Sequence, residues 1–451
     1  MLETIAGANA GGQPSATTRR LVDAVGLSCT LGYAALAFLA RPPGEPDLVA
    51  FFILMAWTGL PVFGLFLYCH RRDEPFPLDR LLFWAIAFRI CGLVGGPLFE
   101  DDFYRYLWDG YRFATAGTPY AAVPEAFFTD PTVPATFHTV LDGINHPELP
   151  TIYAPTTQFV FLLGYWLRPG SIAALQLLLI VIDLATVVLL LRLAPARSVM
   201  LYAWCPLVVK EIAFTAHLDG IGVGLLLAAL VLARARRWQR TAVCLGLACG
   251  AKIFALVLVP FVLVGASVRH WVLFGATLAA LYAPFALSGG TDLHSLLVFA
   301  QEWEFNSAAF GLLTLALPAF EAKLVLGLAC ALFWGWYYRR YCRDEGQPVP
   351  RGDWVYGVLL AAAPVINPWY LLWVLPFATI FPSVWAWTAS MSVLISYVTG
   401  LNVNDYELQA YQQPLWARLL EFGLIGLALA WPVFGRIGRQ GKSPTDQGPQ
   451  T

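Results

Sequence analysis

The chain has 451 residues, of which 58% are hydrophobic and 13% are charged, and its formal net charge is −1. This composition excludes an ordinary soluble domain, because apolar stretches of membrane-spanning length recur along the whole chain. No basic and aromatic stripe is present, so no nucleic-acid partner is expected. The eight cysteines are scattered through apolar segments without a CxxC motif, which argues against a disulfide framework or a cysteine zinc site.

The order of apolar and polar segments predicts one transmembrane domain, residues 21–435, between two cytoplasmic tails. Residues 1–20 are rich in small residues and lack a compact signal-peptide pattern. The tail 436–451 is polar and is expected to be disordered. Ten stretches approximate the roughly 20 apolar residues that cross a bilayer. They are residues 21–40, 48–68, 80–98, 171–195, 199–215, 218–233, 270–288, 321–341, 384–400 and 414–435.

Arginine-rich loops set the predicted orientation, because short cytoplasmic loops carry an excess of Lys and Arg. The segments placed in the cytoplasm are 69–80, 234–240, 339–351 and the C-terminal tail. The loop 98–150 carries eight acids against Arg105 and Arg112, so it is placed on the outer side. The acidic loops 289–306 and 401–413 are placed with it.

This orientation requires two further segments to enter the membrane and return. Residues 241–265 would turn near Lys252, and residues 354–382 would turn at the NPWY motif. A single continuous span over 241–265 fits the hydropathy equally well. Residues 155–168 and 307–319 are left as re-entrant or juxtamembrane helices, which survive only where protein or a water-filled cavity satisfies their backbone. The predicted fold is an all-α polytopic membrane protein of about 11–13 transmembrane helices.

Three consecutive acids at a predicted helix exit, Glu100, Asp101 and Asp102, open the outer loop 98–154. A carboxylate at this boundary can act as a general base toward an alcohol. Two adjacent acids could instead bind a divalent metal, or merely solvate the helix end. The aromatic and charged residues that follow at helical spacing favour a functional role; they are Tyr104, Arg105, Trp108 and Asp109.

Two cations are expected inside the membrane region, where an unpaired charge is costly. Arg89 lies in the middle of the span 80–98 and would pair either with a phosphate or with an acid such as Asp183. Lys252 lies in a GAK turn of an apolar segment, where a phosphate contact is favoured over a structural ion pair.

Two histidines and their neighbours complete the candidate site. His217 and Asp219 form an HxD pattern that could be a metal half-site, a base or a helix cap, and the cap is favoured for Asp219. They are not expected to share a helical face with both members of the adjacent pair Lys210 and Glu211, which could neutralise one another. His146 and Tyr153 lie in a proline-stiffened segment and could contact a substrate hydroxyl or merely pack. Asn367 and Tyr370 of the NPWY motif are expected on the same side of the membrane.

Several of these stretches, taken together and in order, resemble the polytopic glycosyltransferase C superfamily, in particular its polyprenyl-phosphate-mannose-dependent mannosyltransferase-like branch. The matching stretches are EDDFYRYLWDGYRFATAGTPY, NHPELPTIYAP, WCPLVVKEIAFTAHLDG, LACGAKIFALVLVP and NPWYLLWVLP, and they extend from about residue 80 to residue 376.

The resemblance implies a hexosyltransferase that takes sugar from a polyprenyl phosphate, without a nucleotide sugar, and inverts the anomeric carbon. It implies that an acid of the first outer loop is the base, either Asp101 or, as first choice, Asp102. Arg105, Lys252 and Arg89 are then the candidates for the leaving phosphate. Mannose is the favoured sugar, although no residue identifies it. No cofactor is implied, and a divalent metal is possible but not expected.

The implied partners are a lipid-linked sugar donor, membrane lipids, and a glycan, lipid or glycolipid acceptor. The Ala, Leu and Arg content favours a bacterial inner membrane with the site facing the periplasm. Two other classes remain open. A lipid-linked sugar transporter or flippase would also show broken helices and intramembrane charges. An inactive family member acting as an assembly factor is disfavoured by the intact acidic pair.

Overall fold

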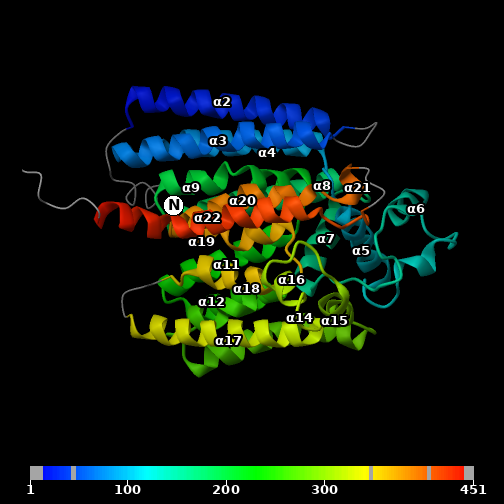
Figure 1. Cartoon of the computed structure of the whole chain (residues 1–451). Coiled ribbons are helices and arrows are strands. Elements are labelled where there is room, and N and C mark those ends of the chain that lie inside the picture. Colours follow the sequence, from blue (N-terminus) through cyan, green and yellow to red (C-terminus); the bar gives the residue numbers. More distant parts are fainter. Residues whose placement is uncertain (1–13, 42–46, 345–348, 404–407, 441–451) are drawn as a thin grey trace, which may run out of the picture.

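The computed structural model describes residues 14–41, 47–344, 349–403 and 408–440, so the first residues of the chain and its C-terminal end from 441 lie outside it. These described residues form an all-helical bundle, which confirms the predicted fold class (Figure 1). They contain no strand, only one isolated parallel bridge between Phe305 and Val365. The long helices run side by side, and the helices α5, α6, α15 and α21 gather at one end of the bundle.

In the first half of the chain the elements are α2 (Ala16–Leu39), α3 (Leu48–Arg72), α4 (Leu78–Gly95), α5 (Asp102–Ala116), η1 (Pro124–Phe127), α6 (Ala135–Asp142), α7 (Pro155–Leu167), α8 (Ile172–Leu190), α9 (Ala196–Ala203), α10 (Pro206–Val208), η2 (Val209–Phe214) and α11 (Asp219–Arg234). The second half consists of α12 (Trp238–Cys249), η3 (Ile253–Leu258), α13 (Val259–Val262), α14 (Val268–Leu287), α15 (Leu293–Glu302), α16 (Ala309–Leu313), α17 (Ala319–Arg343), α18 (Gly352–Ala362), η4 (Pro368–Trp373), α19 (Leu375–Ile380), α20 (Val384–Ser392), η5 (Val393–Tyr397), α21 (Gly400–Val403) and α22 (Leu415–Gln440).

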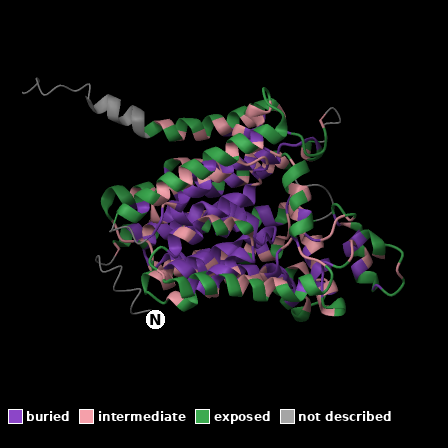
Figure 2. Cartoon of the chain, turned by 90° about the horizontal axis from the view of Figure 1, so that it is seen from below, coloured by how far each residue is buried: buried purple, intermediate pink, exposed green. Residues whose placement is uncertain are grey.

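Among the residues that the structure describes, five helices are each long and apolar enough to cross a membrane, namely α2, α3, α8, α14 and α17, and the bent pair from Pro206 to Arg234 could add a sixth crossing. Their outward faces expose large apolar side chains, while the buried residues concentrate in the middle of the bundle (Figure 2). A soluble protein rarely exposes such continuous apolar surface, so these faces suit lipid. The remaining predicted crossings consist of shorter or more charged helices.

Small residues allow the N-terminal helices to pack closely. A Cβ atom added to Gly26 of α2 would lie 2.4 Å from the Trp84 ring of α4, and one added to Gly95 would lie 2.7 Å from the backbone of Ala37. Such close approach is typical of helix pairs in membranes, where dispersion contacts rather than the hydrophobic effect hold helices together.

The predicted span 199–215 is wrong as a continuous helix. It divides into α9, the short α10 and the π-helix η2, and the chain then bends by 116° into α11. Pro206 lacks a backbone N–H, and Ala216 has a positive φ of 61°, so neither continues a regular helix. π-Helical turns of this kind occur frequently at functional sites.

Both predicted hairpins are present. The Trp238 ring lies about 3.2 Å from the position of a Cβ on Gly265, so the segment 241–265 reverses and the alternative of a continuous span is wrong. In the second hairpin, Gly352 at the start of α18 lies against the Phe377 ring of α19. The breaks at Lys252 and at the NPWY motif lie at the turns of these hairpins.

Candidate active site

The three acids Glu100, Asp101 and Asp102, called the acidic exit below, lie in the tight connection between α4 and α5. Gly96 has φ 96°, which favours glycine, and Phe99 has φ 60°, which is strained for an aromatic residue. The rings of Phe51 and Tyr397 hold Phe99 at centroid distances of 5.0 and 5.5 Å. This packing turns the chain so that Asp102 starts α5 at the mouth of a cavity.

A cavity of about 1240 Å³ brings together motifs that are far apart in the sequence. The predicted site residues that line it are Asp101, Asp102, Arg105, His146, Tyr153, Asp219, Lys252, Asn367 and Tyr370. They come from five separate parts of the chain. The cavity therefore has a polar end made by loop residues and hairpin turns, and its size suits a ligand larger than a single sugar.

The three acids differ in their surroundings. Glu100 is half-buried and lines the cavity, and desolvation by burial raises the pKa of its carboxyl well above its usual range. Burial also raises the pKa of Asp101, with the nearby Asp102 charge adding to it, although Asn145 donates a hydrogen bond to Asp101. The Asp102 side chain keeps 35% of its surface exposed, so it is accessible from the cavity.

Lys252 and Asp219 form an ion pair at the polar end. The Lys252 Nζ lies 2.7 Å from Asp219 Oδ1 and 4.2 Å from the centre of the Tyr370 ring, and the Lys252 side chain remains 19% exposed. Trp373 Nε1 donates to the same Asp219 oxygen at 2.6 Å, whereas Oδ2 has no protein partner. The structure thus shows Lys252 in a structural ion pair with Asp219, and the same lysine also lines the cavity. The predicted cap role of Asp219 is wrong, because its side chain caps no backbone N–H of α11.

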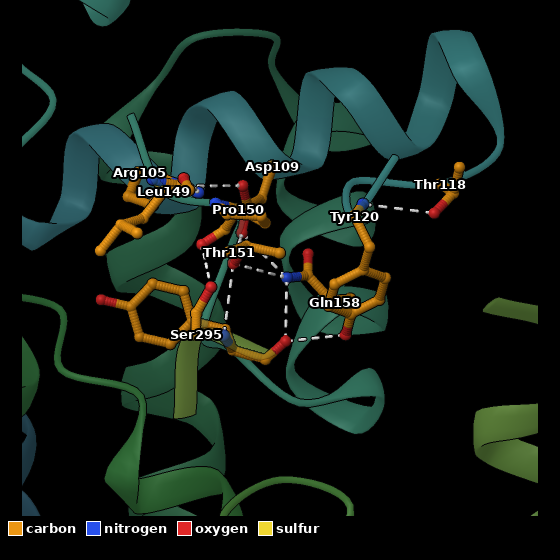
Figure 3. Close-up of polar contacts among 10 residues, drawn as sticks. Arg105, Asp109, Thr118, Tyr120, Leu149, Pro150, Thr151, Gln158 and Ser295 are labelled. Carbon is orange, nitrogen blue, oxygen red and sulfur yellow. Dashed lines mark hydrogen bonds and ion pairs between the residues drawn. The ribbon is translucent and has the colours of Figure 1, made fainter. Parts of the chain in front are cut away.

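Arg105 and Asp109 of α5 form hydrogen bonds with the proline-stiffened segment and hold it against this helix (Figure 3). Arg105 donates to the Leu149 carbonyl at 2.8 Å and to Asp109 at 3.2 Å. The buried Asp109 also accepts hydrogen bonds from Thr151 and Gln158. Burial raises the pKa of Asp109 while the Arg105 charge opposes the rise. Asp109 does not line the cavity; it holds the segment that does.

Two further contacts fix the same segment from other elements. Tyr120 donates to the Tyr153 carbonyl at 2.7 Å, and Ser295 of α15 donates to the Pro150 carbonyl at 2.8 Å. His146, at the start of the segment, has φ 51°, lies 3.1 Å from Glu148 and packs its ring edge-on against Trp303. One wall of the cavity is therefore formed by the extended segment 146–153, which hydrogen bonds hold at several points along its length.

Five predicted site residues do not line the cavity; besides Asp109 they are Arg89, Tyr104, Trp108 and His217. Arg89 is buried and pairs with Asp183, and it donates to the carbonyls of Ala85 and Ala203 at 2.9 Å. Of the two alternatives predicted for Arg89, the structure shows the ion pair with Asp183 rather than a position suited to a phosphate. Tyr104 and Trp108 point into a small cluster in the outer loop, with Tyr104 against Gly143 and Trp108 against other aromatic rings. They are packing residues in this arrangement.

A buried polar network lies behind the acidic exit. His217 Nδ1 lies 2.7 Å from Glu211 Oε2, and Glu211 in turn contacts Lys210 and accepts a hydrogen bond from Tyr397 at 2.9 Å. The His217 Nε2 lies 4.0 Å from Asp102 Oδ2. Tyr397 had no signal in the sequence. Trp369 of the NPWY motif stacks its ring on His217 at a centroid distance of 3.9 Å.

Within the described residues, no three His, Cys, Asp or Glu side chains gather in the manner of metal ligands. The expectation that transfer needs no metal remains a prediction.

Residues 37–268, just over half of the chain, match the family model described as alpha-(1->6)-mannopyranosyltransferase, N-terminal domain. No curated protein and no solved structure matches the chain.

Proposed function

The chain belongs to the alpha-(1->6)-mannopyranosyltransferase family, so its activity is mannosyl transfer, and we propose that the mannose comes from a polyprenyl phosphate. The acceptor is a hydroxyl of a glycan, lipid or glycolipid, and the reaction occurs at the outer face of the membrane. The observation that carries the proposal is the single cavity in which Asp102, Lys252 and an apolar wall meet.

The apolar wall supports a lipid-linked donor. From Lys252 the lining continues through residues of η3, α14 and α15, including Ile253, Leu256, Leu278 and Leu296. Ile253 and Leu256 are also about half exposed. An isoprenoid chain could therefore reach the cavity sideways from the bilayer while its phosphate stays near Lys252. A soluble nucleotide sugar would have no use for this wall.

Asp102 is the proposed general base. Its carboxylate takes the proton from the acceptor hydroxyl as that oxygen attacks the anomeric carbon, and the bond from this carbon to the lipid phosphate breaks. Attack opposite to the leaving phosphate inverts the anomeric carbon. An alpha-linked product then requires a beta-linked donor. Asn145 donates to Asp101, and burial raises the pKa values of Asp101 and Glu100, which favours Asp102 for this role.

The leaving phosphate is proposed to lie beside Lys252 and Arg105. A fixed cation near developing negative charge contributes most when water is excluded and the protein does not have to reorganise. Asp219 and the Tyr370 ring hold Lys252 in place, and the Leu149 carbonyl and Asp109 hold Arg105. Both cations are therefore oriented before the donor arrives.

The test is sugar transfer by the purified protein in lipid nanodiscs. Radiolabelled polyprenyl-phosphate mannose, polyprenyl-phosphate glucose and a nucleotide-linked mannose would be compared, each with membrane-extract acceptors. We expect label transfer from polyprenyl-phosphate mannose alone. The anomeric coupling constants of donor and product, measured by NMR, would report inversion or retention.

Asp102→Asn is the matched variant, because asparagine keeps the shape of the side chain but cannot take the proton. We expect at least about a hundredfold loss of turnover, the usual contribution of a positioned base, with donor binding retained. Near-normal turnover of this variant would remove Asp102 as the base. Donor binding without transfer in the wild-type protein, unchanged in the variant, would favour a flippase instead.

A further inference from the structure

His217 has one ring nitrogen fully engaged and the other unpartnered. The residue is 1% exposed, Nδ1 contacts Glu211 at 2.7 Å, and the Trp369 ring covers one face of the imidazole. Nε2 is buried and has no hydrogen-bond partner, although it lies 4.0 Å from Asp102 Oδ2. Leaving a buried polar atom unsatisfied costs free energy, so such an atom beside a proposed base needs a reason.

The network assigns the tautomer of His217. The Glu211 carboxylate already accepts a hydrogen bond from Tyr397 and is paired with Lys210, so it is an ionised acceptor. Nδ1 must therefore carry the hydrogen that it shares with Glu211. In neutral His217 this leaves the lone pair on Nε2, on the side of Asp102.

The π-helix creates this arrangement. The backbone N–H of His217 donates to the Glu211 carbonyl at 2.8 Å, across the turn that ends η2. In a regular α-helix the two residues would lie far apart around the axis, because six steps of about 100° do not return to the same face. The irregular turn thus places a histidine beneath the acidic exit.

We propose that His217 accepts the proton that Asp102 removes from the acceptor, so that Asp102 is ionised again before the next turnover. The step rests on the proposed function and balances as follows. The acceptor O–H bond breaks and the proton passes to Asp102 as the glycosidic bond forms and the lipid phosphate leaves. The proton then moves from Asp102 to Nε2 of His217, and the resulting imidazolium is stabilised by the Glu211 carboxylate. Release of the proton to water completes the cycle.

Other charged or titratable groups surround the relay on every side. Lys210 and Glu211 face it from η2, Tyr397 from η5, and Asp102 from α5, while Glu100 lies near this network. The Lys210 charge offsets that of Glu211 within this network. His217 acts through Asp102 and is therefore a positioning and proton-holding residue.

The experiment compares His217→Ala with the wild-type protein in the nanodisc transfer assay, with and without added imidazole. We expect turnover to fall at least about a hundredfold, as for loss of an acid–base group, with the KM for polyprenyl-phosphate mannose within about threefold of wild type. Imidazole should restore turnover, and the restored rate should rise with the concentration of neutral imidazole. His270→Ala is the matched control, because His270 is also buried but its ring nitrogen lies against the Ser267 hydroxyl rather than against an acid of the site.

His217→Gln provides a second measurement if the alanine variant fails to fold, because glutamine can still contact Glu211 but cannot hold a proton. Its turnover should be low, and its pH–rate profile should differ from that of the wild-type protein. Wild-type turnover and an unchanged profile in either variant would overturn the inference, and so would a loss that imidazole does not restore in folded His217→Ala. A wild-type protein that transfers from no polyprenyl-phosphate donor would overturn the proposed function as well.

Discussion

Lys252 is the residue whose role can be isolated most directly, because it contributes a charge to the cavity without belonging to the acidic exit. Its ammonium is shared between Asp219 and the Tyr370 ring and still faces the space where a donor phosphate is proposed. A lysine with an internal partner is oriented, and an oriented cation stabilises a leaving phosphate better than a mobile one.

Lys252→Ala should therefore impair use of the donor. We expect kcat/KM for polyprenyl-phosphate mannose to fall about a hundredfold or more, as when one preorganised donor is removed from an active site, with the acceptor KM unchanged. Lys252→Arg keeps the charge and should retain a larger share of activity. Because Asp219 would lose its partner, the double variant Lys252→Ala, Asp219→Asn is the control for misfolding. Equal losses toward donor and acceptor would return Lys252 to a purely structural role.

Asp292 offers a prediction about pH and stability. It lies in the loop before α15, and burial raises the pKa of its carboxyl to about 6 from an ordinary value near 4. The folded state then holds this proton more tightly than the unfolded state does. Stability from Asp292 is therefore present at low pH and is lost as the pH rises from about 4 to about 6, on the order of 3 kcal/mol for a rise of about two pKa units.

Asp292→Asn should remove that loss, because asparagine stays neutral. The Tm of the variant in nanodiscs should equal the wild-type value near pH 4 and exceed it at pH 7.5. A variant less stable than wild type at pH 7.5 would show that the ionised carboxylate makes a favourable contact.

At the scale of elements, the hydrogen bonds between α5 and the segment 149–153 hold one wall of the cavity in place. Asp109 is three positions from Tyr106, the nearest residue of α5 that lines the cavity, and its partners Thr151 and Gln158 lie 42 and 49 residues further along the chain. It positions a wall of the cavity without touching the space inside. Its contribution to transfer should therefore depend on the folded segment.

Asp109→Asn should destabilise the protein by about 3 kcal/mol, because Arg105 would lose its buried counter-charge. We expect a lowered Tm together with a raised acceptor KM, measured in the same nanodisc assay. Asp142→Asn is the matched control, since Asp142 is an exposed acid at the end of α6 in the same outer loop and its substitution should leave both quantities unchanged. An unchanged Tm in Asp109→Asn would show that the segment is held by its other contacts.

At the scale of elements, the sequence predicted those features that depend on composition and spacing. The long apolar helices and the acidic start of α5 follow from hydropathy and charge. Both hairpins follow from the number of membrane crossings that places the arginine-rich loops on one side. The π-helix at 209–214 could not be predicted, because one extra residue in a turn leaves no trace in the hydrophobic pattern. The partners of Arg89, by contrast, were among the alternatives, since a buried arginine requires an acid and Asp183 was available in a neighbouring span.

At the scale of the whole molecule, the cavity combines a charged end with an apolar flank in one space. The sequence indicated that the polar motifs share one side, because the loop charges set the orientation. It could not show that Tyr104 and Trp108 turn away from this space, since their packing depends on Gly143 and other residues of the loop cluster. Helical spacing alone does not show which face of α5 lines the cavity and which face packs against the loop.

Chelation tests the expectation that no divalent metal takes part. Lys252 and Arg105 provide positive charge beside the proposed phosphate position, so transfer by the wild-type protein should persist in excess EDTA. Addition of Mg²⁺ or Mn²⁺ after exhaustive chelation should not increase turnover. A loss with EDTA that either metal reverses would require a metal at the acidic exit.

The hairpin that carries Lys252 also affects how the chain is inserted during its synthesis. Its two arms together are long enough to be threaded as one crossing, and every later helix would then be inverted. The loops around 289–306 and 401–413 would end on the side opposite Asp102, so the cavity could not assemble. Arg240 and Arg269 stand at the two ends of the hairpin and keep both ends on one side. Removing the charge of Arg269 should therefore reduce the yield of assembled protein, measured against total protein, and leave the turnover of the assembled fraction unchanged.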